Sequence, residues 1–225
     1  MSILVVDVGT SGVRGAVVRP DGAVDHIHHV AVLPETPFPG LVEFDAVAMA
    51  DAVVEVASRS LAEGGPVEAV GIANQRASTI VWDRATGVPV GPGLGWQDLR
   101  TVGTCLELQS QGFRMAPNAS ATKVAALLDM ADPDRSRSER GELACGTVDT
   151  WVAWTLSGGL LHLTDASNAG VTGLIRSDGS GWSAEALDAL RIPASMMPAI
   201  VDSSGPMGAA EILTGRPVIA GMAGD

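Results

Sequence analysis

Short apolar runs rich in β-branched residues open the chain, and glycine-containing turns separate them. Residues 3–8, 13–18 and 23–32 therefore predict three strands, joined by turns at Gly9–Gly12 and Asp21–Gly22. Because both turns are short, we expect the three strands to pair as a meander. The first run is apolar almost throughout, which is typical of a strand buried on both faces.

Helical spacing begins after this meander. Asp45 is a suitable N-cap for a helix that continues to about Glu63, where Gly64-Gly65-Pro66 ends it. Further strands are predicted at residues 67–73, 79–82 and 217–220, and further helices at 101–109, 122–130, 149–156 and 183–190. The charged stretch 132–142 predicts a solvated loop. Together these elements predict an α/β fold, with a mixed β-sheet flanked by helices, in one domain spanning residues 1–225.

Composition narrows the classes of function. The chain has 225 residues, 46% of them hydrophobic, and its 26 acidic against 14 basic side chains give a formal net charge of −12. We therefore expect no nucleic acid and no membrane among its partners, because phosphate contacts need clustered cations and Lys123 is the only lysine. Cys105 and Cys145 are expected to be reduced thiols. With neither a signal sequence nor a membrane anchor in the pattern, we expect a cytoplasmic protein.

The segment from Asp7 to Arg14 has the composition of a phosphate-binding turn. Its glycines, Gly9 and Gly12, let backbone N–H groups approach a ligand, and the hydroxyls of Thr10 and Ser11 can donate to phosphate oxygens. Arg14 can neutralise charge, while Asp7 can hold a hydrated Mg²⁺. The segment lacks the Gly-Lys-Ser/Thr of a P-loop, and taken alone it is equally typical of an ordinary hairpin turn.

Three further segments place polar groups where a ligand could bind. Asn74-Gln75-Arg76 follow a predicted strand, the position at which open α/β sheets bind ligands. Trp96, Gln97 and Asp98 combine an aromatic face with polar groups, as polyol sites do, although each loop alone is more typical of a structural ion pair. Asp225 follows a strand and a glycine, and an acid with no neutralising neighbour can act as a general base.

Taken in order, nine segments resemble the FGGY carbohydrate kinases, most closely their glycerol kinase branch, along essentially the whole chain. They are Asp7–Ser11, Gly71–Arg76, Val81–Asp83, Trp96–Asp98, Ser120–Lys123, Gly146–Trp151, Thr164–Ala169, Ile192–Pro198 and Ala220–Asp225. The resemblance implies a ribonuclease-H-like domain of the actin and hexokinase type, which is the N-terminal, substrate-binding half of a kinase. It also implies ATP-dependent phosphorylation of a sugar or polyol hydroxyl, and it is compatible with a homodimer.

The same resemblance implies a role for each candidate residue. The metal ligand is Asp7, which organises Mg²⁺ beside ATP, and the catalytic base is Asp225, which takes the proton from the attacking hydroxyl. The residues expected to meet the transferred phosphate are Gly9, Thr10, Ser11 and Arg14. Those expected to contact the substrate are Gln75, Arg76, Trp96 and Asp98.

Three departures leave other functions open. Ala77 stands where glycerol kinases carry a glutamate that binds glycerol hydroxyls, and Asn118 replaces their tyrosine. Losing such partners weakens recognition of glycerol, so a larger or differently hydroxylated substrate is at least as well supported. The family's kinases are also about twice as long, and the nucleotide-binding C-terminal domain is absent from this chain. The alternatives are a sugar-binding module without catalysis and an interaction subunit that uses the fold as a scaffold.

Overall fold

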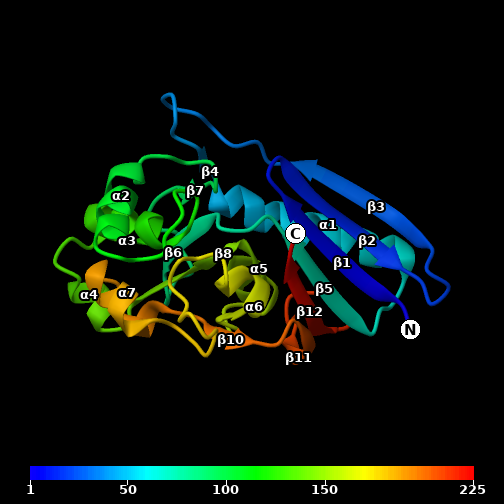
Figure 1. The fold of residues 1–225 in the computed structure, drawn as a ribbon. Coiled ribbons are helices and arrows are strands. Elements are labelled where there is room, and N and C mark those ends of the chain that lie inside the picture. Colours follow the sequence, from blue (N-terminus) through cyan, green and yellow to red (C-terminus); the bar gives the residue numbers. More distant parts are fainter.

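The computed structural model describes residues 1–225, and its largest sheet has six strands in the order β11-β12-β5-β1-β2-β3 (Figure 1). Their bounds are β1 (Ile3–Gly9), β2 (Gly12–Val18), β3 (Val24–Ala31), β5 (Ala69–Asn74), β11 (Ser204–Ala209) and β12 (Val218–Gly224). β1, β5 and β12 run parallel, while β2, β3 and β11 pair antiparallel with their neighbours. The mixed sheet and its opening meander are confirmed. β12 continues to Gly224, four residues beyond its predicted end, because it stays paired with β5.

The helices α1 (Ala46–Gly64) and α5 (Val148–Leu156) pack together against the same sheet. In β1 only alternate residues, Leu4, Val6 and Val8, are fully buried, whereas Val5 and Asp7 are half-buried. The prediction that this strand is buried on both faces was therefore wrong. The pattern is apolar on both sides, yet the helices cover it fully on only one.

Helix α1 begins where the sequence predicts. The Asp45 carboxylate accepts hydrogen bonds from the backbone N–H groups of Val47 at 2.8 Å and Ala48 at 2.9 Å, which caps the first turn. The helix approaches β2 closely at Gly15, where an added Cβ would lie 2.8 Å from the carbonyl oxygen of Val56. Glycine at this position therefore sets the distance between helix and sheet.

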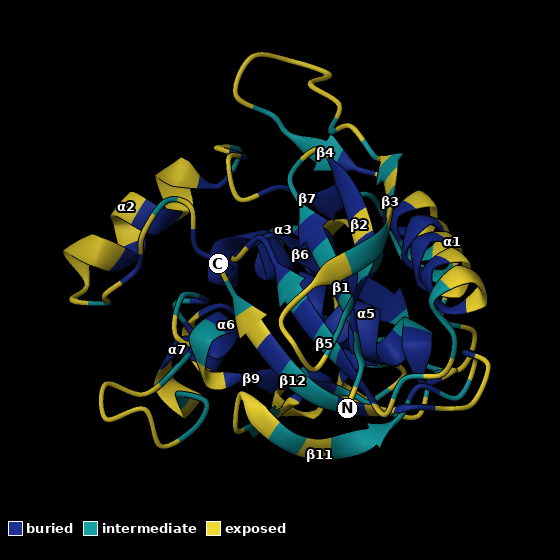
Figure 2. Cartoon of the chain, turned by 90° about the vertical axis from the view of Figure 1, so that its right-hand side faces the viewer, coloured by how far each residue is buried: buried dark blue, intermediate teal, exposed yellow.

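The remainder of the chain forms a four-stranded sheet in the order β4-β7-β6-β8, a two-stranded sheet and several helices. The strands are β4 (Glu43–Phe44), β6 (Thr79–Asp83), β7 (Gly93–Leu94), β8 (Leu143–Thr147), β9 (Leu163–Asp165) and β10 (Ala199–Val201). The helices are α2 (Val102–Ser110), α3 (Ala121–Ala131), α4 (Ser136–Glu139), α6 (Ala166–Ala169), α7 (Ala184–Ala189) and the short 3₁₀ helix η1 (Ala194–Met196). Figure 2 shows that α2 is largely exposed, whereas the strands between it and α1 are mostly buried or intermediate. None of the helices combines the length and the apolar character needed to cross a membrane.

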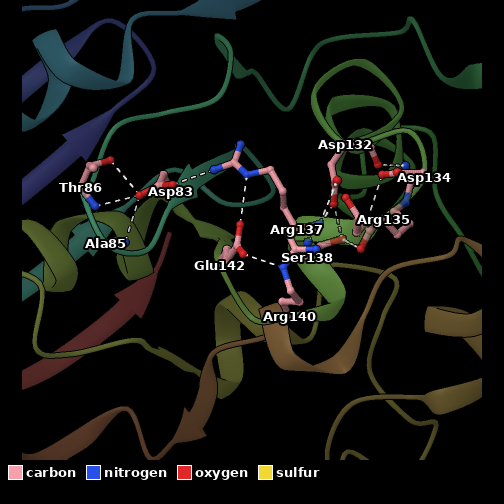
Figure 3. Close-up of polar contacts among 11 residues, drawn as sticks. Asp83, Ala85, Thr86, Asp132, Asp134, Arg135, Arg137, Ser138, Arg140 and Glu142 are labelled. Atoms are coloured by element: carbon pink, nitrogen blue, oxygen red, sulfur yellow. Dashed lines mark hydrogen bonds and ion pairs between the residues drawn. The ribbon is translucent and has the colours of Figure 1, made fainter.

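The charged segment 132–142 is not the solvated loop that its composition predicts (Figure 3). Asp132 is buried, and its carboxylate accepts hydrogen bonds from the Ser138 backbone N–H at 2.8 Å and the Ser138 hydroxyl at 2.7 Å. Burial opposes ionisation, but these bonds hold the pKa of Asp132 below its usual value. Arg135 is also buried and donates to the carbonyl oxygens of Asp132 and Arg191. Polar side chains that satisfy one another explain why this charged sequence is folded.

Candidate functional site

A cavity of about 310 Å³ lies where the carboxyl ends of the parallel strands β1, β5 and β12 meet. It is lined by Thr10, Gln75, Arg76, Ala77, Trp96, Asn118, Val171 and Asp225. These residues come from segments far apart in the sequence, which the sheet topology gathers at one edge. Three larger surface cavities, of about 390, 460 and 620 Å³, contain none of the predicted site residues. The cavity at the sheet edge is therefore the candidate site.

A chain of hydrogen bonds connects three walls of the cavity. The Gln75 side-chain amide donates to the carbonyl oxygen of Gly9 at 3.3 Å, and its oxygen accepts from the Ser78 hydroxyl at 3.1 Å. That hydroxyl accepts in turn from the backbone N–H of Trp96 at 3.0 Å. Gln75 is almost fully buried, so it lines the cavity and also holds the neighbouring segments in register.

The indole of Trp96 forms one wall and closes against the turn between β1 and β2. Its Nε1–H donates to the hydroxyl of Thr10 at 3.3 Å, and 38% of the residue remains exposed. An aromatic face left open beside polar groups suits the C–H faces of a polyol. This contact joins the Trp96 loop to the Thr10 turn, segments that are 86 positions apart in the sequence.

Two charged side chains in the cavity are not engaged by the protein. Neither the Arg76 guanidinium nor the Asp225 side chain has a hydrogen-bond or ion-pair partner in the structure, and both residues are exposed. The backbone around them is firmly held, because the Asp225 N–H donates to the carbonyl oxygen of Asn74 at 3.1 Å. A polar ligand binds well to charged groups that are held in place and have no partner within the protein, and Arg76 and Asp225 are two such groups of opposite charge.

Gly224 provides the surface on which Arg76 lies. A Cβ added at Gly224 would lie 2.3 Å from Cγ and 2.5 Å from Cδ of Arg76, and 3.1 Å from the side-chain oxygen of Asn168. The Gly224 N–H donates to the Ser167 hydroxyl at 2.8 Å. The absence of a side chain at Gly224 therefore lets Arg76 cross the end of β12 next to Asp225.

A buried polar network supports the ends of β5 and β12. Asn168 accepts from the Asn74 amide at 2.8 Å and donates to the Asp165 carboxylate at 2.8 Å. Asp149, deeper in the core, accepts from the Thr164 hydroxyl at 2.6 Å, and burial raises its pKa to about 6. The sequence analysis placed Asn74 among the polar groups that could meet a ligand, but it assigned no role to Asp149, Asp165 or Asn168. The available signal was Asp149, an acidic side chain within the largely apolar helix Val148–Leu156.

Asp98 does not line the cavity, contrary to its expected place beside the substrate. It is fully buried, accepts from the Val42 backbone N–H at 2.6 Å and forms an ion pair with Arg100 at 2.9 Å. Burial alone would raise the pKa of Asp98, but the hydrogen bonds from Arg100 and Val42 hold it below its usual value. Asp98 thus acts as the structural ion pair that was the alternative interpretation of this loop.

The turn between β1 and β2 presents the remaining candidates. Thr10 and Ser11 form a two-residue hairpin loop between the paired residues Gly9 and Gly12. The Asp7 carboxylate lies 3.3 Å from the Arg14 guanidinium, and both side chains are substantially exposed.

The chemistry at this turn fits a hydrated Mg²⁺. No group of three His, Cys, Asp or Glu side chains forms a closed metal cage anywhere in the chain. A single exposed carboxylate, Asp7, does suit Mg²⁺, because this ion keeps several waters and is commonly shared between a carboxylate and substrate phosphates.

Comparisons with known proteins place this geometry in context. Residues 2–218 match the family model described as the FGGY family of carbohydrate kinases, N-terminal domain. A glycerol kinase from Trichlorobacter lovleyi is 41% identical over 239 aligned positions, covering 99% of this chain and 48% of the relative. The chain therefore spans about half the length of the curated relatives it matches.

Solved structures share the fold. A Plasmodium falciparum glycerol kinase with ADP superposes with a TM-score of 0.92 at 21% identity, covering all of this chain and 48% of that one. A xylulose kinase from Rhodospirillum rubrum superposes with a TM-score of 0.86 at 18% identity, covering all of this chain and 49% of that one. The expected ribonuclease-H-like fold, a mixed sheet flanked by helices, is confirmed.

Proposed function

The chain belongs to the FGGY family of carbohydrate kinases, and we propose that the protein transfers a phosphoryl group from ATP to a hydroxyl of a sugar or polyol. Residues 1–225 would supply the substrate-binding part of the active site. The observation that carries the proposal is the cavity at the sheet edge, in which Arg76 and Asp225 are positioned by backbone contacts yet have no protein partner. Phosphoryl transfer depends mainly on such positioning and on neutralisation of charge.

The proposed chemistry assigns one task to each wall of the cavity. The Asp225 carboxylate accepts the proton of the attacking hydroxyl, which increases the nucleophilicity of that oxygen. The fork of N–H donors on Arg76 binds substrate hydroxyl oxygens, and the exposed face of Trp96 packs against substrate carbons. The hydrogen bond from Trp96 to Thr10 keeps this wall beside the phosphate-binding turn.

The turn between β1 and β2 would receive the transferred phosphoryl group. The backbone N–H groups and hydroxyls at Thr10 and Ser11 can donate to its oxygens, with Gly9 allowing close approach and Arg14 adding positive charge. Mg²⁺ held by Asp7 and the phosphates would neutralise negative charge as the phosphoryl group moves.

The cavity walls favour a substrate other than glycerol. Ala77 and Asn118, the two departures from the glycerol kinase pattern, both line the cavity. Ala77 offers neither charge nor hydrogen bonds to a hydroxyl, and it leaves space that a larger substrate would fill. Asn118 is exposed and offers a neutral amide that can both donate and accept. We therefore propose a sugar or polyol longer than glycerol.

The test is ADP release by the full-length protein with a panel of three- to seven-carbon polyols, ketoses and sugar acids. The proposal expects ATP- and Mg²⁺-dependent turnover with at least one member, and a loss of about 10²–10⁴-fold in kcat in Asp225→Asn. Full activity in Asp225→Asn would remove this residue as the base. Polyol binding by calorimetry without turnover, and without any effect of ATP, would favour the non-catalytic sugar-binding module instead.

A further inference from the structure

The only lysine in the chain is fully buried directly behind the cavity. Lys123 lies in the first turn of α3, and its Nζ donates to the carbonyl oxygen of Trp96 at 3.2 Å and to that of Asn118 at 3.0 Å. Trp96 and Asn118 are separated by 22 positions in the sequence, and each lines the cavity. One ammonium group therefore joins two walls of the candidate site from behind.

The buried surroundings of Lys123 make the positive charge of its ammonium group energetically unfavourable. Burial lowers the pKa of Lys123 to about 8, and the negative charge of Asp98 opposes that shift. Asp98 is the acidic group that faces the lysine, but its charge is already shared with Arg100, which also pairs with Glu43. An apolar side chain at this position would avoid the cost of desolvation, although it would leave both carbonyl oxygens without their donor.

We propose that Lys123 is a positioning residue for substrate binding, which fixes Trp96 and Asn118 relative to each other through their backbone carbonyls. This inference rests on the proposed kinase function and adds a determinant of substrate affinity that touches no substrate atom. The ammonium form holds the two carbonyls with charge-assisted hydrogen bonds. The neutral amine keeps two N–H donors but binds both carbonyls more weakly, so the walls loosen when the proton is lost.

The direction of the pH effect follows from this protonation. Below about pH 8 Lys123 is charged and holds the Trp96 and Asn118 walls of the cavity in place. Above about pH 8 these walls loosen, and the KM for the polyol rises. We expect KM to increase about tenfold between pH 7 and pH 9.5, the scale of one weakened charge-assisted hydrogen bond, with a smaller change in kcat.

The experiment measures polyol affinity and turnover of the full-length protein at pH 7, 8, 9 and 9.5 for wild type, Lys123→Met and Lys123→Arg. Lys123→Met should have a raised KM at pH 7 that no longer changes with pH, and Lys123→Arg should lack the alkaline rise because guanidinium stays charged. The matched control is Arg135→Met. It removes another buried cation that donates to two backbone carbonyls and also pairs with Asp129, and none of its partners lines the cavity. Its pH profile should match that of wild type.

A measurement without substrate keeps the inference testable if the variants unfold or no polyol is turned over. The protein is labelled with 5-fluorotryptophan, and the ¹⁹F signal of Trp96, assigned with Trp96→Phe, is followed with pH. A change in that signal, with the same midpoint as the Cε resonance of ¹³C-labelled Lys123, is expected. A Trp96 signal that stays constant while Lys123 titrates would overturn the positioning role. An unchanged KM profile in active wild type would overturn it as well, whereas absence of turnover with a responsive Trp96 signal would count against the kinase function alone.

Discussion

The substitution Gly224→Ala should weaken substrate binding while leaving the fold intact. The new Cβ would lie 2.3 Å from Cγ and 2.5 Å from Cδ of Arg76, where ordinary contacts begin at 3.4 Å. The arginine side chain must therefore move by about 1 Å from near its root, and its exposure leaves room for another rotamer. Misplacement of a substrate-binding group by about 1 Å can cost on the order of 10²-fold in activity. We expect the KM for the polyol to rise about 10- to 100-fold.

The stability of the variant should change little. Gly224 has no left-handed backbone conformation, and the displaced Arg76 atoms belong to an exposed side chain without a protein partner, so the free energy of unfolding should fall by less than about 1 kcal/mol. The matched control is Gly221→Ala on the same strand. Its added Cβ would lie 3.9 Å from the carbonyl oxygen of Ser203 and 4.0 Å from the Cα of Gly71, an ordinary contact. This control should retain the KM and melting temperature of wild type.

A double-mutant cycle identifies the cause. If Gly224→Ala acts only by displacing Arg76, the pair Arg76→Ala with Gly224→Ala should be no weaker than Arg76→Ala alone. A further loss in the pair would show that the new methyl group also disturbs Asn168 or Asp225. An unchanged KM in Gly224→Ala, with Arg76→Ala impaired, would refute the argument from packing.

Three other substitutions probe the substrate wall and the polar support beneath it. Ala77→Glu restores the carboxylate of the glycerol kinase pattern, so kcat/KM for glycerol should rise at least about tenfold in the ADP-release assay; no rise would remove Ala77 as a determinant. Asp149→Asn should alter the pH dependence of stability in urea unfolding. Because burial raises the pKa of Asp149 to about 6, the folded state binds its proton more tightly than the unfolded chain, and wild type gains about 2 kcal/mol over the variant as pH falls from 7 to 4. A constant difference would contradict this. Asn168→Ala should lower the free energy of unfolding by about 1–3 kcal/mol, because it leaves Asn74 and Asp165 without a shared partner. In the same variant kcat should fall more than KM rises. A loss of stability with kcat unchanged would show that this network does not contribute to catalysis.

Local sequence signals were sufficient for the elements that form from local interactions. The turn at Thr10–Ser11, the cap at Asp45 and the helices α2, α3, α5 and α7 lie within one or two residues of their predicted places. Each depends on residues close in sequence: a glycine-containing turn, a capping carboxylate, or an apolar stripe. Six strands were not predicted. Four of them, β4, β7, β9 and β10, are only two or three residues long, whereas β8 and β11 have five and six residues and were missed despite their length.

Polar residues whose partners are distant in sequence were misjudged. Asp98 was expected in the cavity because it neighbours Trp96, but its oxygens bind Val42 and Arg100. Asp132 was expected in solvent because its segment is charged, but that charge is satisfied internally. The sequence shows which polar groups need hydrogen-bond or ion-pair partners, but the partners themselves depend on contacts between residues that are distant in the sequence.

The position of β12 has a consequence for how the protein folds. This strand lies inside the sheet, between β5 and β11, and pairs with residues about 150 positions earlier in the sequence. Such a pairing closes a long loop and forms slowly compared with the local meander of β1 to β3. Until β12 is in place, one edge of β5 is unpaired, and Asp225, which follows β12, has no fixed position. Assembly of the sheet and completion of the site are therefore one late event in folding.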